Sequence, residues 1–135
     1  MPRGTWIYER TGGGGGGGPF VRTLLLKDAT VANDIADHVP IFRAGPVVRV
    51  IGVLRTAITE DLVVRVNLNL PPDYTGGVEL VVLTIPADTE VDHPVIETTF
   101  TPPSFPDLAV LSWDVVESDG QTNSGGIASI TVQWQ

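Results

Sequence analysis

The feature that most constrains the fold is the regular alternation of residues 62–70, which read Leu-Val-Val-Arg-Val-Asn-Leu-Asn-Leu. The even-numbered positions are all apolar, whereas Arg65, Asn67 and Asn69 stand on the odd-numbered ones. Because successive side chains of a β-strand point to opposite faces, this pattern predicts a strand with one buried apolar face and one solvent-facing polar face. A slip of one residue would expose five large apolar side chains, so the register is strongly fixed.

The preceding segment, residues 47–58, shows a second alternation. Its inner set consists of Val48, Val50, Gly52, Leu54, Thr56 and Ile58. Arg49 and Arg55 fall on the opposite parity. We therefore predict that residues 47–58 and 62–70 form a hairpin, with residues 59–61 as the turn.

The rest of the chain consists of short apolar segments separated by Gly and Pro turns. Further strands are predicted at residues 20–27, 39–42, 78–85, 94–101, 108–116 and 127–134. About eight strands with little helix favour an all-β fold, an antiparallel two-sheet β-sandwich of jelly-roll type. Residues 78–85 are almost continuously apolar, which predicts a strand covered on both faces or lying in a subunit contact. Trp113 and Trp134 fall on inward parities and are expected in the core.

The first 19 residues are interpreted as an extended N-terminal arm, and residues 20–135 as the sandwich domain. The arm contains seven consecutive glycines, Gly12 to Gly18, which have no side chains to pack and are expected to form a flexible tether. Aromatic and arginine residues are typical of binding hot spots. The candidate partner-binding residues of the arm are therefore Arg3, Trp6, Ile7, Tyr8 and Arg10. The alternatives are that this cluster folds back on its own domain, or that the arm is disordered.

The net charge of −8 is unevenly distributed along the chain. Residues 1–55 hold seven of the eight basic residues, and after Arg65 there is no Lys or Arg. Phosphate contacts need clustered basic residues, so no nucleic-acid partner is predicted. No apolar segment approaches the ~20 residues that cross a bilayer, so no membrane partner is predicted either. The acidic body is expected to dock on a basic surface or to pair with basic N-terminal parts of other copies; alternatively, the acids only keep a β-rich protein soluble.

The sequence offers little support for catalysis. Cysteine is absent, which excludes thiolate metal sites and cysteine nucleophiles. His38 and His93 each follow an aspartate, but no second histidine stands at ligand spacing. The loop of residues 117–123 has several oxygen ligands that could suit calcium, yet a turn at Asp119 and Gly120 explains the same residues. We therefore predict no enzyme activity, no cofactor and no metal site.

Several short segments of the chain carry a family resemblance. They are residues 36–44, 50–57, 83–87, 118–120 and 127–128. From Leu24 onward, about four-fifths of the chain, the sequence resembles small β-sandwich domains of tailed-bacteriophage virions. These domains occur as capsid decoration (cement) proteins and as terminal modules of fibres.

The resemblance implies a structural protein of the virion, usually oligomeric and often trimeric, with no cofactor. The leading expectation is a capsid decoration subunit, made in the host cytoplasm, that binds the outside of a phage shell through its arm and strand contacts. Its partners would be the major capsid protein and neighbouring copies of itself. The alternative is a head or tail fibre module that recognises a host-surface glycan or receptor.

Overall fold

The computed structural model describes residues 4–10, 20–32, 39–40, 44–72, 74, 78–100, 104–106 and 109–135. Ten strands and no helix are found in these residues. The strands are β1 (Gly4–Arg10), β2 (Phe20–Leu26), β3 (Val39–Pro40), β4 (Gly45–Leu54), β5 (Leu62–Asn69), β6 (Val78–Ile85), β7 (Pro94–Glu97), β8 (Ser104–Phe105), β9 (Val110–Glu117) and β10 (Ala128–Trp134). The predicted all-β class is confirmed.

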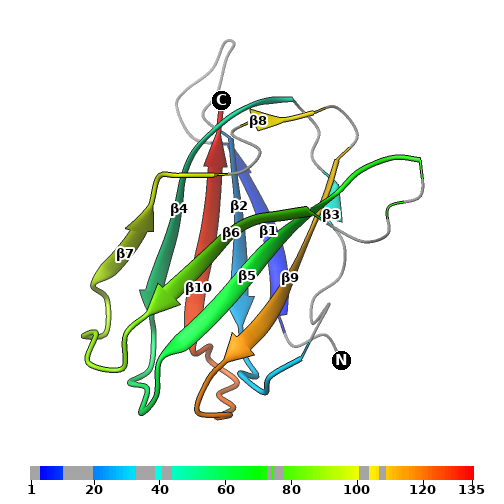
Figure 1. Cartoon of the computed structure of the whole chain (residues 1–135). Helices are drawn as coiled ribbons and strands as arrows, with labels where there is room; N and C mark the ends of the chain where they lie inside the picture. The colour runs from blue at the N-terminus through cyan, green and yellow to red at the C-terminus, as the bar shows by residue number, and fades with distance from the viewer. Residues whose placement is uncertain are drawn as a thin grey trace.

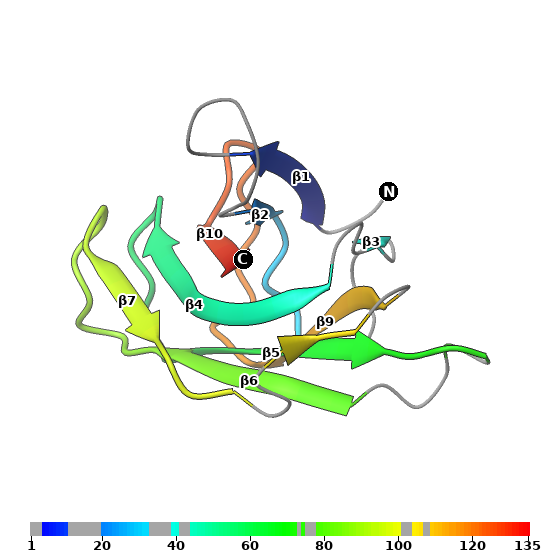
Figure 2. The ribbon, with the colours of Figure 1, turned by 90° about the horizontal axis from the view of Figure 1, so that it is seen from above.

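The strands form two antiparallel sheets that lie face to face (Figures 1 and 2). One has the order β1-β2-β10-β4-β7, with β8 also paired to β4, and the other has the order β3-β9-β5-β6. The pairs β2–β10, β3–β9, β4–β7 and β5–β6 each join an early strand to a late one, as in a long hairpin wound around itself. This is the jelly-roll arrangement of a two-sheet β-sandwich.

The core lies between the two sheets and is filled from alternate positions of the strands. Trp113 and Trp134 are fully buried in it, as their parity predicts. The ring of Trp134 stacks on Phe20 with a centroid separation of 5.8 Å. At Gly52 the two sheets approach closely, since an added Cβ would lie 2.6 Å from Leu83 Cδ2. A glycine in this strand therefore serves the contact between sheets.

The predicted hairpin between residues 47–58 and 62–70 is wrong. β4 lies in the larger sheet, between β10 and β7, whereas β5 lies in the other sheet, between β9 and β6. Residues 55–61 thus cross from one sheet to the other. Two strands that each have one apolar face can bury those faces side by side in one sheet or opposite each other across a sandwich. Alternation within the strands does not distinguish these arrangements.

The expected polar face of β5 is only partly solvent-facing. Leu62, Val64, Val66 and Leu68 are buried as predicted. Asn67 and Asn69, however, are only 8% and 4% exposed. They are satisfied by side chains of β9, since Asn67 Nδ2 donates to Asp114 Oδ2 at 3.0 Å and Asn69 Nδ2 to Ser112 Oγ at 2.9 Å. Buried polar groups need such partners, so these asparagines are part of the packed structure.

Residues 78–85 form an edge strand that is not covered on both faces within this chain. Leu83 and Ile85 are fully buried, while Val78 and Val82 are 45% and 37% exposed. The prediction of double coverage inside the domain is wrong for β6. The other branch of that prediction, a contact with another subunit, stays a prediction.

Part of the expected arm belongs to the larger sheet. Gly4–Arg10 pairs with Phe20–Leu26 in continuous antiparallel register. The backbone of these residues therefore folds back on its own domain, as the alternative interpretation predicted. It does not extend away from the domain. Met1 to Arg3 and the glycine segment lie outside the described residues.

Candidate interaction surface

The outer face of the larger sheet presents two rows of uncharged side chains, one residue from each of four strands. One row consists of Thr23, Thr131, Ile51 and Ile96, on β2, β10, β4 and β7. The second consists of Leu25, Ser129, Val53 and Pro94. Residues of the opposite parity, such as Leu24 and Ile130, are fully buried, which places these two rows on the solvent side. We call the eight residues of the two rows the neutral face.

The neutral face combines aliphatic and hydroxyl side chains. Thr23 and Thr131 join their hydroxyls across β2 and β10 at 3.0 Å. At the edge strand, Ile96 is 49% exposed. The next row, toward the C-terminal end of β10, contains a charged residue, Arg49, which lies opposite Gln133. An uncharged sheet surface suits a protein contact, because a partner can cover it without burying an unpaired charge.

The outer face of the smaller sheet has a different chemistry. Arg65 on β5 forms an ion pair with Asp114 on β9, with Nη2 2.7 Å from Oδ2. Asn67 donates to the same carboxylate oxygen. Asp114 is 6% exposed in its side chain and Arg65 is 35% exposed. These groups are engaged with one another, so this part of the face is held by internal polar contacts.

The predicted partner-binding residues fall at the edge of the larger sheet. Trp6, Ile7, Tyr8 and Arg10 lie on β1, opposite Leu24, Thr23, Arg22 and Phe20 in register, while Arg3 lies outside the described residues. Among the strands described, β1 pairs only with β2. A strand at the edge of a sheet can pair with a strand of another molecule. The docking role of these five residues stays a prediction.

The loop considered for calcium binding is organised by internal hydrogen bonds. Asp119 Oδ2 accepts from Thr59 N at 2.9 Å, Thr59 Oγ1 at 3.2 Å and Gln121 Nε2 at 2.8 Å. Partial burial by itself would raise the pKa of Asp119, but the hydrogen bonds from Thr59 and Gln121 outweigh it and hold the pKa below its ordinary value. The carboxylate thus ties the β9–β10 loop to the β4–β5 loop.

The candidate His–Asp pairs are not assembled into a site in the part of the chain that the structure describes. His93 Nε2 lies 3.3 Å from Glu90 Oε2 rather than against Asp92, and both partners are largely exposed. His38 lies outside the described residues. Over the described ranges, no group of three or more His, Cys, Asp or Glu could hold a metal ion. In the same ranges, no helix is long and apolar enough to cross a membrane.

No protein-family model, curated protein or solved structure matches this chain. The neutral face was not anticipated from the sequence, because its rows combine residues from four strands far apart in the chain. The individual strands show only alternation, and the pairing of β10 with both β2 and β4 creates the rows.

Proposed function

We propose that this chain is a structural subunit of a tailed-phage virion, a capsid decoration protein that packs against neighbouring copies of itself on the shell. The contact between copies is made by the neutral face. Each copy also binds the major capsid protein, with the β1 edge and the N-terminal segment as the elements that reach a neighbour. This role requires no catalytic residues and no cofactor.

The observation that carries the proposal is the contrast between the neutral face and the charge of the molecule. The chain has a net charge of −8, so two copies repel each other at most orientations. Like charges brought together across an interface cost several kcal/mol. The neutral face offers a surface on which two copies meet without opposing carboxylates. The exposed Ile96 at its edge supplies apolar area to the contact.

The jelly-roll fold is compatible with this role but does not decide it, because the same architecture occurs in capsid and lectin domains. Support for the phage context comes from the sequence resemblance described above. Edge strands are a common means of extending a sheet into a neighbouring molecule. β1 would provide one such edge.

The proposal is tested by co-sedimentation of the purified chain with shells assembled from the capsid protein encoded alongside it. Saturable binding to undecorated shells is the expected result. Binding to cells or glycans without shell binding would instead favour the fibre-type module. Sedimentation equilibrium of the free protein would report its oligomeric state, for which a trimer is predicted.

One specific observation favours a recognition function as a second candidate. A polar pocket lies at one end of the sandwich, next to Leu25 of the neutral face, and it is lined by residues of three different loops. A decoration subunit does not need such a pocket to bind a shell.

A further inference from the structure

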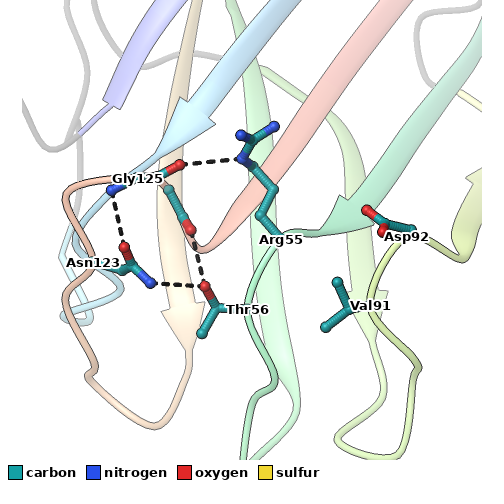
Figure 3. A pocket seen from close by; sticks show the side chains of 7 residues that line it. Arg55, Thr56, Val91, Asp92, Asn123 and Gly125 are labelled. Carbon is teal, nitrogen blue, oxygen red and sulfur yellow. Dashed lines mark hydrogen bonds between the residues drawn. The ribbon is translucent and has the colours of Figure 1, made fainter.

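Four connections meet at one end of the sandwich, shown at the bottom of Figure 1. They follow β2, β4, β6 and β9, since Leu26 and Leu54 both lie opposite Ala128, and Leu62 lies opposite Ile85. A pocket of about 290 Å³ opens at this end. It is lined by Arg55, Thr56, Val91, Asp92, Asn123, Gly125 and Gly126 (Figure 3). Loop clusters held by a rigid sheet are common places for binding sites.

The wall formed by the β9–β10 loop is fixed by hydrogen bonds. Thr56 Oγ1 donates to the Gly126 carbonyl at 3.1 Å and accepts from Asn123 Nδ2 at 2.8 Å. Asn123 Oδ1 in turn accepts from Gly125 N at 2.9 Å. Gly126 has a φ of +101°, and a Cβ there would lie 2.6 Å from Leu25 Cδ1. The wall is thus preorganised, which lowers the cost of binding a ligand.

Arg55 is oriented by this wall. Its Nε donates to the Gly125 carbonyl at 3.2 Å, and its backbone N donates to the Ile127 carbonyl at 2.7 Å. The terminal nitrogens of its guanidinium make no hydrogen bond or ion pair with any residue that the structure describes. In the view of Figure 3, the guanidinium stands between Gly125 and Asp92. Arg55 therefore offers hydrogen-bond donors to the pocket.

Asp92 enters from the β6–β7 loop. Its backbone N donates to the Leu54 carbonyl at 2.9 Å, which anchors this loop beside the end of β4. Its φ of +70° is uncommon for a residue other than glycine, and such conformations are concentrated at functional sites. Within the described ranges, its carboxylate makes no hydrogen bond or ion pair, even with Arg55. Asp92 therefore offers hydrogen-bond acceptors.

The charges around the pocket restrict the ligand. Arg55 and Asp92 balance each other within it. The four connections also carry further carboxylates, among them Glu60, Asp61, Asp88 and Glu90. This acidic surrounding disfavours an anion such as phosphate. A neutral polyhydroxyl compound fits better, because each hydroxyl can accept from the guanidinium and donate to the carboxylate. Val91, which is 39% exposed, offers apolar contact to the C–H groups of a sugar.

We propose that this pocket binds a neutral saccharide unit, with Arg55 as donor and Asp92 as acceptor to its hydroxyls. The volume is near the lower end for ligand sites, so a single sugar unit occupies it. This site does not depend on the decoration role. The neutral face and the pocket adjoin at Leu25 but consist of different residues, so either assignment can fail alone.

The test is a ¹H–¹⁵N NMR titration of the full chain with glucose, galactose, mannose and N-acetylglucosamine. At least one sugar should shift the backbone signals of Thr56, Asp92 and Gly125 and the Nε signal of Arg55, with saturation in the millimolar range. Asp92→Asn keeps the side-chain shape and tolerates a positive φ, yet it removes the charged acceptor. It should weaken binding about tenfold or more, since hydrogen bonds to charged groups are the stronger ones. Arg55→Gln should have an effect of the same size.

The matched control is Asp88→Asn, which removes a carboxylate of the same loop outside the pocket lining and should leave the affinity unchanged. The proposal is overturned if none of the four sugars shifts these signals. It is equally overturned if Asp92→Asn and Arg55→Gln bind as the natural chain does. A titration with sodium phosphate provides the last distinction, because saturation by phosphate at the same residues would identify an anion site in place of a saccharide site.

Discussion

Arg65 reaches across from β5 to Asp114 on β9 and places both Nε and Nη2 on the same carboxylate oxygen, at 2.8 and 2.7 Å. Asn67 supplies a third donor to that oxygen. A buried ion pair adds to stability only when further hydrogen bonds satisfy its atoms, and this arrangement provides one. The polar side of β5 is therefore a structural network and not a solvated surface.

The first prediction concerns this network. From the alternation alone, Asn67→Asp would be a harmless change on a wet face. In the structure it removes a donor to Asp114 and places a second carboxylate beside it, so we expect a loss of about 3 kcal/mol in unfolding free energy. Urea denaturation measures it. Glu79→Gln, at the exposed position opposite Asn67 on β6, should change stability by less than about 0.5 kcal/mol. Equal effects of the two substitutions would mean that the network contributes nothing.

The second prediction concerns the packing of the two sheets. Gly52→Ala would place a Cβ 2.6 Å from Leu83 Cδ2 and 2.9 Å from Ile85 Cδ1. Relief of this overlap needs movement of buried side chains and should cost about 1–3 kcal/mol. The matched control is Gly125→Ala, whose Cβ would meet nothing nearer than 3.4 Å. Thermal melting compares them, and an unchanged melting temperature for Gly52→Ala would contradict the described contact between β4 and β6.

The third prediction concerns acid. Because the pKa of Asp119 is lowered in the folded protein, its carboxylate stabilises the fold above its ordinary pKa of 3.8. That stabilisation is lost as the pH falls through the lower, folded value. Asp119→Asn should therefore melt below the natural chain near neutral pH, and the difference should shrink on acidification. Melting temperatures measured across this range test it. A difference that grows toward low pH would have the opposite sign and would refute the assignment.

The fourth prediction concerns β1. Deletion of residues 1–18 removes a strand that pairs with β2 along seven positions. We expect the remaining sandwich to fold with a lower melting temperature, because β2 becomes an edge strand. Hydrogen exchange should be faster at the β2 amides that face β1. Exchange rates and a melting temperature that match the full chain would show that β1 is not stably paired in solution.

Much of the fold could be predicted from the sequence because it depends on local patterns. The parity of Leu62, Val64 and Val66 and the inward position of both tryptophans follow from alternation, and all are confirmed. The partner of each strand does not follow. The pairing of β4 with β10 joins residues from distant parts of the chain, and no local pattern records it. The hairpin prediction was wrong for that reason.

The candidate sites were harder to predict. The neutral face needs residues of four strands in register, and the pocket brings together Arg55, Asp92 and Asn123 from three loops. The sequence pairs Asp92 only with its neighbour His93, whereas in the structure Asp92 lines the same pocket as Arg55. The burial of Asn67 was likewise not predicted. An asparagine at an outer position of a strand is expected to face solvent unless its hydrogen-bond partner, here Asp114, is known.

If the neutral face joins neighbouring copies on a shell, a charge placed on that face should weaken binding. Occupancy on undecorated shells is measured for the natural chain, for Ile96→Asp on the neutral face and for Ser124→Asp in the exposed β9–β10 loop. A charge at Ile96 faces the neighbouring copy, so Ile96→Asp should need about tenfold more protein for half occupancy. Ser124→Asp should bind as the natural chain does. Equal occupancy curves for the three proteins would contradict the claim.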